Sequence, residues 1–404
     1  MKNQADMNRV ILVLNSGSSS LKFQVLRMPG ETRICQGMVE RIGAGDARLK
    51  FDSGKAKYER QLAVTDHKEA LRHIVSALLD PDTGVLRDSK DVAAVGHRVV
   101  HGGTRFTGTT RVDAAVKEAI ADLSRLAPLH NPANLEGIRQ AESFFHEAIQ
   151  VAVFDTAFHQ TIPMKARRYA IPESLYREHG VQVYGFHGTS HKYIAEQLRP
   201  HLPEDGKLVC LHLGSGCSAT AIRGGVSLDH SLGFTPSNGL VMGSRSGDID
   251  HGVIFYMVES LGYPLEEVKR ILSRESGLKG LTGKSDLRDI EAVAATGDPD
   301  CQLALEMAAY RIRKYIGAYA AAMNGLDGVA FTAGIGEHSS RMRELVCRDM
   351  EFLGIRLDAD CNAAPGPGLQ SIHAEDSRVK LWVVPTDEEL EIARQTYQVL
   401  TGSA

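Results

Sequence analysis

The sequence predicts an α/β protein built from two related halves, and two observations support this prediction. Apolar segments with the period of strands alternate along the chain with segments that have the period of helices. A strand, a Gly/Ser turn and a second strand occur twice, with Gly17 and Gly216 in equivalent places 199 residues apart, about half of the 404-residue chain. A chance likeness between two common hairpin turns is the alternative. The aligned serines are Ser16 with Ser215 and Ser19 with Ser218.

In the first half, strands are expected at residues 10–15, 21–27 and 33–40, because Gly/Ser or Pro-Gly turns separate these apolar segments. Residues 66–79 have the helical period, with Leu71, Ile74 and Leu78 on one face. A buried strand at 92–100, an amphipathic helix at 112–126 and a short strand at 151–155 follow. The last of these ends in a carboxylate.

In the second half, strands are expected at 208–213 and 217–222. Residues 301–323 predict a long helix whose small residues permit close packing. A strand at 329–333 leads into a Gly-x-Gly turn, and Ser339 or Ser340 can cap the helix that follows. A last strand at 381–384 precedes a helix from about Asp387.

Composition narrows the class of protein. The chain has 46 Lys and Arg against 50 Asp and Glu, and this formal charge of −4 argues against nucleic-acid binding. The longest apolar run near the N-terminus, residues 10–14, is too short for a signal peptide or for a membrane span of about 20 residues. The six cysteines include no C-x-x-C pair. We expect a cytoplasmic protein of two or three domains that binds neither membrane nor nucleic acid.

Glycine-rich turns at strand ends suit phosphate binding, because glycine lets backbone N–H groups approach and serine adds hydroxyl donors. The two hairpins and a third Gly-rich turn at 333–336 favour this function, although an ordinary turn remains the alternative for any one of them. A P-loop is excluded because Leu278 stands five residues before Gly283. A G-x-G-x-x-G segment between a first strand and a helix is also absent.

Two arginines and two histidines are candidates for anion chemistry. Arg98 lies at a strand end beside a glycine pair, and Arg245 is flanked by glycines and small hydroxyl residues, from where it can reach a phosphoryl group. His187 and His191 are four residues apart and can share a helical face, but no third metal ligand is evident. The structural alternatives are a surface arginine and buried histidines.

Two carboxylates complete the set. Asp155 closes a buried strand, and Glu388 follows the strand at 381–384. Carboxylates at such positions often hold Mg²⁺, which takes one or two of them together with water and phosphate oxygens. For residues 387–389, favouring or capping a helix N-terminus is a strong alternative.

Together these motifs resemble the acetate kinase family, within the superfamily of acetate and sugar kinases, heat-shock ATPases and actin. The likeness extends over essentially the whole chain. It implies a duplicated ribonuclease-H-like (actin-like ATPase) fold, with two lobes that close around a central cleft. The lobes would comprise residues 1–155 with 393–404, and residues 156–392. The matching segments are NSGSSS at 15–20, VFDTAFHQ at 153–160, YGFHGTSH at 184–191, GFTP at 233–236, SRSGDID at 244–250, FTAGIGE at 331–337 and PTDEEL at 385–390.

The resemblance also implies roles for individual residues. Asp155, His187 and Arg245 would be catalytic, while Asn15 and Glu388 would hold Mg²⁺, for which Mn²⁺ can substitute. The acid would be bound by Arg98 and His130 and by an apolar pocket of Val100, Leu129, Phe186 and Pro236. The nucleotide site would comprise Ser18, Ser20, His212, Leu213, Gly214, Ser215, Gly216, Asp286, Leu287, Arg288, Gly334, Ile335, Gly336, Glu337 and His338.

The implied reaction is the reversible, Mg²⁺-dependent transfer of the γ-phosphate of ATP to acetate, giving acetyl phosphate and ADP, in a homodimer. A carboxylic acid is already ionised at pH 7, so attack needs no strong base. The obstacle is the approach of two anions, which arginines, imidazoles and a metal ion offset. This chemistry suits direct in-line transfer.

Some positions depart from the family pattern, and alternatives stay open. The family commonly has Asn at 215, Thr at 230, Leu-Glu at 237–238, Pro at 251 and Asn at 387, where this chain has Ser, His, Ser-Asn, His and Asp. Residue 215 bears on nucleotide binding, and 237–238 on the acyl pocket. A propionate or butyrate kinase is the nearest alternative. A nucleotide-dependent switch or filament and a phosphatase of the same superfamily are alternatives of other classes.

Overall fold

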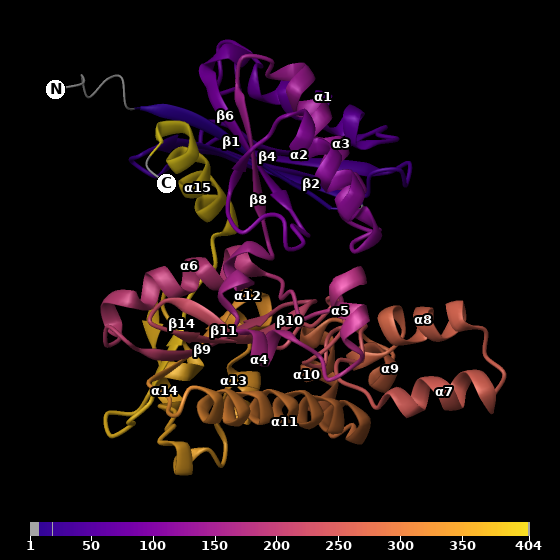
Figure 1. Cartoon of the computed structure of the whole chain (residues 1–404). Helices are drawn as coiled ribbons and strands as arrows, with labels where there is room; N and C mark the ends of the chain where they lie inside the picture. Colours follow the sequence, from indigo (N-terminus) through magenta and orange to yellow (C-terminus); the bar gives the residue numbers. More distant parts are fainter. Residues whose placement is uncertain (1–7, 18, 403–404) are drawn as a thin grey trace. The chain divides into compact units, whose positions relative to one another are not determined.

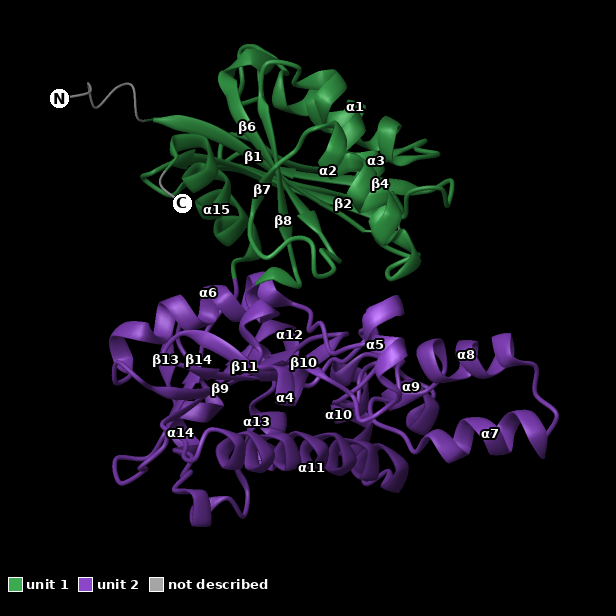
Figure 2. Ribbon diagram, in the orientation of Figure 1, with its two compact units in different colours: residues 1–157, 387–404 green, residues 158–386 purple. Residues whose placement is uncertain are grey.

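The computed structural model describes residues 8–17 and 19–402, which form two compact units (Figures 1 and 2). Unit 1 comprises Met1–Ala157 with Asp387–Ala404, and unit 2 comprises Phe158–Thr386. The chain therefore leaves unit 1 once and returns to it once. The lobes expected from the sequence have their boundaries after residues 155 and 392. That these lobes close on substrates stays a prediction.

Unit 1 contains a mixed eight-stranded sheet in the order β5-β4-β3-β2-β1-β6-β8-β7. Strands β1, β2 and β3 pair antiparallel, whereas β6 is parallel to β1 and β8 is parallel to β6. The bounds are β1 Arg9–Ser16, β2 Ser20–Met28, β3 Thr32–Glu40, β4 Ala47–Asp52, β5 Lys57–Leu62, β6 Val92–Val99, β7 Thr110–Arg111 and β8 Ile149–Phe154.

Unit 2 contains a six-stranded sheet in the order β11-β10-β9-β12-β14-β13. Strands β9, β10 and β11 pair antiparallel, whereas β12 is parallel to β9 and β14 is parallel to β12. The bounds are β9 Lys207–Leu213, β10 Cys217–Arg223, β11 Val226–His230, β12 Gly328–Thr332, β13 Gln370–Ser371 and β14 Lys380–Val383.

Five strands of each unit therefore share one order and one set of directions. In both units the Gly/Ser hairpin joins the first strand to the second, at Gly17 in unit 1 and at Gly216 in unit 2. The predicted α/β class and the predicted duplication are confirmed, and the likeness of the two hairpins is not chance. The expected strands and the expected helices at 66–79, 301–323 and from 387 onward are all present, with bounds that differ by a few residues.

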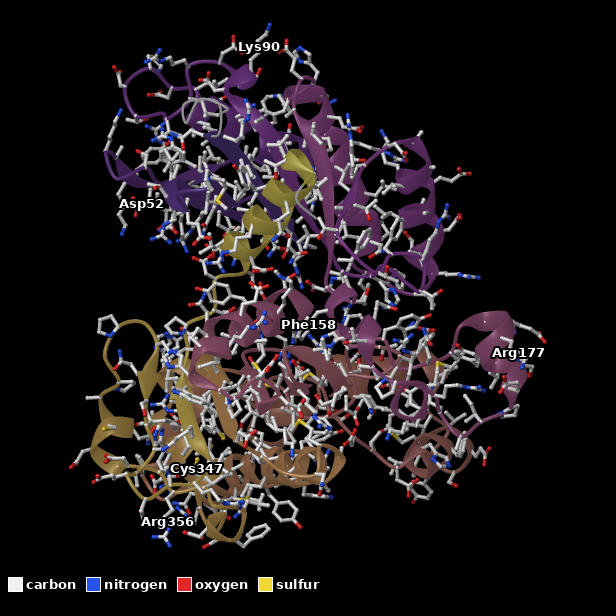
Figure 3. The ribbon with its side chains drawn as sticks, turned by 60° about the vertical axis from the view of Figure 1, so that its left-hand side comes forward. Asp52, Lys90, Phe158, Arg177, Cys347 and Arg356 are labelled. Atoms are coloured by element: carbon white, nitrogen blue, oxygen red, sulfur yellow. The ribbon has the colours of Figure 1, made fainter. Side chains whose placement is uncertain are left out.

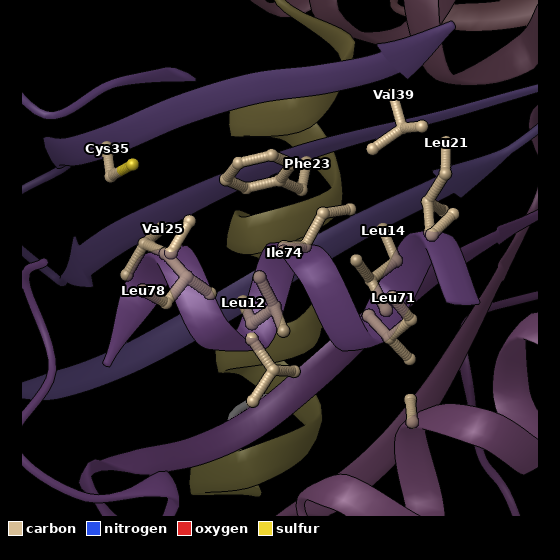
Figure 4. Packing of buried hydrophobic residues seen from close by; sticks show 14 of the residues in the cluster. Leu12, Leu14, Leu21, Phe23, Val25, Cys35, Val39, Leu71, Ile74 and Leu78 are labelled. Carbon is tan, nitrogen blue, oxygen red and sulfur yellow. The ribbon is translucent and has the colours of Figure 1, made fainter. Parts of the chain in front are cut away.

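Helices cover both faces of the unit 1 sheet. On one face, α1 packs with Leu71, Ile74 and Leu78 against strand residues that include Phe23 (Figure 4). On the other face lies α15, whose Ile392 joins a separate apolar cluster (Figure 4). The helices are α1 His67–Leu78, α2 Ala114–Asp122, α3 Asn131–Phe144 and α15 Glu388–Thr401.

The sheet of unit 2 lies between α6 on one face, through Ile194 and Leu198, and the long α11 on the other. Helix α6 of unit 2 comes after β8, the last long strand of unit 1. Helix α15 of unit 1 comes after β14, the last long strand of unit 2. The helices are α4 Met164–Arg167, α5 Glu173–His179, α6 Gly188–Leu198, α7 His251–Glu259, α8 Leu265–Arg274, α9 Gly277–Thr282, α10 Leu287–Ala294, α11 Pro299–Ala322, α12 Ala333–His338, α13 Ser340–Cys347 and α14 Ala359–Ala363.

The surfaces of both units carry exposed ion pairs. In unit 1, Lys90 contacts Glu147 at 2.9 Å, and in unit 2, Arg356 contacts Asp376 at 2.7 Å (Figure 3). Such exposed pairs contribute little to stability. Within the described part of the chain, every helix is too short or too polar to span a lipid bilayer.

Candidate active site

The carboxyl ends of three neighbouring parallel strands bring together the polar groups of unit 1. Asn15 lies near the end of β1, Arg98 near the end of β6, and Asp155 directly after β8. Arg98 donates from Nη2 and Nε to Asp155 Oδ2, at 2.5 and 3.0 Å, and from Nη1 to Asn15 Oδ1 at 3.2 Å. Three residues that the sequence singles out separately thus form one hydrogen-bonded group.

Burial strengthens the interaction between Arg98 and Asp155. The side chain of Asp155 is 1% exposed and that of Arg98 is 20% exposed. Burial on its own lowers the pKa of Arg98, but the carboxylates of Asp155 and Glu388 outweigh it and raise the pKa above its usual value. Arg98 therefore keeps its charge, and its planar fork of donors suits a carboxylate.

Glu388 is the first residue of α15, and its neighbours in sequence have structural roles. Asp387 is the N-cap, with Oδ1 accepting a hydrogen bond from the backbone N–H of Leu390 at 2.9 Å. Glu389 is buried and forms an ion pair with Lys22 at 2.7 Å. The capping alternative therefore holds for Asp387 and leaves Glu388 available.

The carboxylate of Glu388 fits a divalent cation. Loss of hydration raises its pKa to about 7, an effect to which Asp155 and Glu389 add and which Arg98 opposes. Among the described residues it has no hydrogen-bond or ion-pair partner. A bound cation would favour its ionised form, and the amide oxygen of Asn15 is a second ligand of the kind Mg²⁺ prefers.

The other predicted residues of unit 1 differ in exposure. Val100 is buried directly after β6, whereas Leu129 is 62% exposed. His130 precedes α3 and makes no side-chain capping bond. Ser20 begins β2, where its carbonyl accepts the backbone hydrogen bond that closes the hairpin turn. Ser18 lies outside the described residues.

In unit 2, three histidines gather around the start of α6 and the end of β9. His187 has a left-handed backbone (φ 55°), and its Nδ1 lies 2.9 Å from Ser218 Oγ. Its ring stacks on that of His212, with centroids 4.3 Å apart and planes at 28°. His191, one turn along α6, is fully buried and reaches the same hydroxyl through Nε2 at 2.8 Å.

Arg245 lies beside this group. Its Nη1 donates to the carbonyl of Pro236, and burial lowers its pKa. A Cβ atom at Gly216 would lie 3.4 Å from His187 Nε2 and 3.5 Å from Arg245 Nη2, so the hairpin turn adjoins both the imidazole and the guanidinium. Gly277 (φ 62°) packs on this loop, where a Cβ would lie 2.6 Å from the carbonyl oxygen of Arg245.

The second hairpin presents its tip to solvent. Ser215 is exposed, Leu213 is buried, and the N–H of Gly214 donates to the carbonyl of Gly216 at 3.0 Å. The His212 ring, which precedes the turn, lies 2.8 Å through Nδ1 from Ser190 Oγ. The turn thus offers backbone donors between one exposed hydroxyl and one fixed imidazole.

Two further segments were expected to bind nucleotide. Asp286 caps α10 and forms a 2.6 Å ion pair with the exposed Arg288. The predicted Gly-x-Gly turn at 333–336 is wrong, because α12 begins directly after β12, with Ala333 in the left-handed region (φ 63°). Glu337 of this helix accepts a hydrogen bond from the N–H of Thr386 at 3.1 Å.

Sequence reasoning missed the extent of the buried histidine cluster. His159 lies 2.9 Å through Nδ1 from Ser227 Oγ and 3.0 Å through Nε2 from the carbonyl of Phe186. His230, where the resemblance leads one to expect Thr, lies beside His159, with ring centroids 4.1 Å apart and planes tilted by 36°. The sequence shows a histidine at position 230, but only the fold shows that it contacts His159, which lies 71 positions earlier.

These features define a class: a two-unit phosphotransferase with the duplicated α/β fold of the actin-like ATPases. Residues 10–394 match the model of the acetokinase family. The acetate kinase of Flavobacterium johnsoniae is 56% identical over 390 residues, covering 96% of this chain and 99% of that protein. The chain belongs to the acetokinase family.

Solved structures agree with this assignment. The crystal structure of Porphyromonas gingivalis acetate kinase is 41% identical, with a TM-score of 0.91, and covers 97% of this chain and 100% of its own. That of a propionate kinase from Francisella tularensis is 38% identical, with a TM-score of 0.90, and covers 96% and 99%. The fold is thus common to family members named for different acids.

Proposed function

We propose that this protein catalyses the reversible transfer of the γ-phosphate of ATP to acetate, giving acetyl phosphate and ADP. The observation that carries the proposal is the 56% identity to an acetate kinase over 96% of the chain. The site chemistry supports it, because cationic and imidazole groups adjoin strand ends and Gly/Ser turns. We propose direct in-line transfer to the carboxylate, which needs no strong general base.

In this proposal, unit 1 supplies the acid and metal ligands. Arg98 binds the substrate carboxylate, and Asp155, its partner at 2.5 Å, fixes the orientation of the guanidinium. Asn15 and Glu388 would hold Mg²⁺, or Mn²⁺ in its place. The bound ion supplies charge neutralisation at the phosphate oxygens.

Unit 2 supplies donors for the transferred phosphoryl group. His187 and Arg245, which both adjoin Gly216, would stabilise the charge that develops on its oxygens. Nucleotide phosphates would contact backbone N–H groups of the second hairpin and residues 334–338. The second hairpin joins β9 to β10, and residues 334–338 belong to α12, which directly follows β12.

The second candidate is a propionate or butyrate kinase, favoured by the 38% identity to a propionate kinase. One methylene in an apolar pocket changes discrimination by about 1–3 kcal/mol, so a few side chains decide chain length. We expect kcat/KM to be highest for acetate when acetate, propionate and butyrate are compared. A higher value for either longer acid would reassign the substrate.

The catalytic proposal is tested with Arg245→Ala, beside Arg177→Ala as a matched control. Arg177 is 74% exposed and lies at the surface of α5 (Figure 3). We expect Arg245→Ala to lower kcat by two to three orders of magnitude, because it removes a donor to the developing charge, roughly as for an oxyanion-hole donor. Near-wild-type turnover would refute this role. ATP binding without any acyl phosphate would indicate a nucleotide switch, and phosphate release without an acceptor a phosphatase.

We also propose that the protein forms a homodimer and works in the cytoplasm. Support for the dimer comes from α7, which has no buried residue and exposes Val253, Phe255 and Tyr256. Support for the compartment comes from the six cysteines, all of which are free thiols. Cell fractionation should recover the activity in the cytoplasmic fraction, and recovery in an extracellular or envelope fraction would contradict it.

A further inference from the structure

A single buried hydroxyl joins two of the histidines in unit 2. Ser218 Oγ lies 2.9 Å from His187 Nδ1 and 2.8 Å from His191 Nε2, and its side chain is fully buried on β10. The hairpin likeness predicts a serine that meets phosphate, yet this hydroxyl is directed at two imidazoles. A hydroxyl has one proton, so it can donate to only one of them.

The environment of His191 decides the direction of this donation. Within the described residues, His191 Nδ1 is buried and has no hydrogen-bond partner. A buried ring nitrogen without a partner is less costly as a bare lone pair than as an unsatisfied N–H group, so the proton of His191 belongs on Nε2. From there it donates to Ser218 Oγ.

Within the described residues Ser218 Oγ has these two partners alone, so its buried proton is satisfied only when it is donated to His187 Nδ1. A nitrogen that accepts a hydrogen bond carries no proton, so the ring proton of His187 is on Nε2. The stacked ring of His212, 4.3 Å away, opposes rotation of the imidazole out of this arrangement. Nε2 and Cε1 form the edge of the ring nearest Gly216, and Arg245 Nη2 lies near the same glycine.

We propose that Ser218 and His191 are positioning residues that hold His187 in the tautomer with its proton on Nε2. This inference rests on the proposed function, in which Nε2–H of His187 donates to the transferred phosphoryl group. It adds a hydrogen-bond chain, His191 to Ser218 to His187, that sets the donor before substrates bind. Neither Ser218 nor His191 touches substrate in this scheme.

The test compares Ser218→Ala with Ser227→Ala. Ser227 is a matched control because it is equally buried and makes a 2.9 Å bond to a histidine of the same cluster, His159, which has no catalytic role in the proposal. Long-range ¹H–¹⁵N NMR spectra of ¹⁵N-histidine-labelled protein report the tautomer, with the His187 signals assigned from His187→Asn. Steady-state kinetics give kcat and KM for ATP and acetate.

We expect the wild-type protein and Ser227→Ala to show the Nε2–H tautomer of His187. Ser218→Ala should show a mixture of tautomers, with kcat about ten- to a hundredfold lower and KM values changed less than about twofold. Ser218→Thr, which keeps the hydroxyl, should restore the tautomer. A larger effect of Ser227→Ala than of Ser218→Ala on kcat would overturn the proposal.

The wild-type spectrum alone decides the central point, even if Ser218→Ala does not fold. An Nδ1–H tautomer of His187 in the wild-type protein would overturn the relay, as would an unchanged tautomer in folded Ser218→Ala. Full activity of His187→Asn would instead remove the catalytic role of His187, while the NMR result for the relay would stand. Failure of the relay and failure of the proposed function are therefore distinguishable.

Discussion

Arg98 and Asp155 form a buried ion pair in unit 1, and the proposed function assigns both residues to the site. With Asp155 only 1% exposed, removal of the guanidinium leaves a buried carboxylate without its main counter-charge. Arg98→Ala should therefore lower the free energy of unfolding by about 3 kcal/mol, besides abolishing acid binding. Urea unfolding measures this change. Arg98→Ala/Asp155→Ala should be more stable than Arg98→Ala, and equal or lower stability of the double variant would contradict the prediction.

His97 gives unit 1 a dependence of stability on pH. It is 2% exposed on β6, with Nε2 2.8 Å from Gln150 Oε1, and burial lowers its pKa to about 4. The unfolded chain, with a pKa near 6.5, binds the proton more readily, so the contribution of His97 is complete above pH 6.5 and is lost as the pH falls to 4. The loss amounts to about 3 kcal/mol.

The measurement for His97 is urea unfolding at several pH values between 7 and 4. His97→Gln should flatten the decline in stability, whereas His146→Gln, at a surface position with a 65% exposed side chain, should not. His101, whose pKa burial also lowers to about 4, accounts for part of the decline that remains. An identical pH profile for wild type and His97→Gln would contradict the assignment.

At the residue scale, sequence reasoning found side chains whose place is fixed by a strand end. Arg98 and Asp155 were predictable because adjacent parallel strands end at one edge of a sheet. Ser218 was not, because a serine two residues past a glycine turn suits phosphate as well as a buried histidine. Only the fold shows that α6 places His191 over that hydroxyl.

At the scale of elements, the packing of α15 on β6 covers the second face of the unit 1 sheet. A Cβ atom at Gly96 would overlap Thr396 Oγ1 and lie 2.8 Å from Ile392 Cγ2. Gly96→Ala should lower stability by about 1–3 kcal/mol through overpacking, and Thr396→Ala in the same chain should recover part of the loss. Thermal unfolding measures both effects.

Gly317 of α11 is the matched control for that substitution. It lies in a helix interior, and a Cβ atom there would meet no other part of the molecule within 4 Å, so Gly317→Ala should raise stability by up to about 1 kcal/mol. Equal effects of the two Gly→Ala changes would show that packing of α15 on β6 does not limit stability.

At the element scale, what sequence patterns missed has physical causes. Strands β4 and β5 form an edge hairpin whose outward residues are charged, so their apolar content is low. Helix α3 begins with Asn131 and Pro132, and such a proline favours a helix start, but the apolar period that follows it is weak. Helix α12 takes the place of the expected turn because Gly336 packs directly on Phe331, where a Cβ atom would lie 3.1 Å from the carbonyl carbon.

At the scale of the whole molecule, the exposed apolar face of α7 bears on the oligomeric state in solution. Helices α7 and α8 pack on one another and extend from the body of unit 2 (Figure 1). Phe255→Glu with Tyr256→Glu should convert a dimer to a monomer in analytical ultracentrifugation, because charges replace apolar contacts. Phe352→Glu, at another exposed position of unit 2, should leave the dimer intact. A monomeric wild-type protein would contradict the proposal.

At the scale of the molecule, the duplication could be predicted and the partition of the chain could not. Gly17 and Gly216 revealed the repeat because turn residues keep their type when a hairpin is duplicated. The division at 386/387 has no such signal. Residues 385–390 (PTDEEL) contain no glycine, and α15 is assigned to unit 1 by the apolar surface that it covers there.

That assignment has a consequence for how the protein is made. During synthesis, the surface formed by Ile11, Val13 and Leu26 emerges early, but Ile392 and Ala393, which cover it, are translated last. At about 5–20 residues per second, residues 158–386 take about 10–45 s to appear. Unit 2 is itself complete only at the end of that interval, because β14 of its sheet is translated last. Until then unit 1 lacks the helix that covers this apolar face.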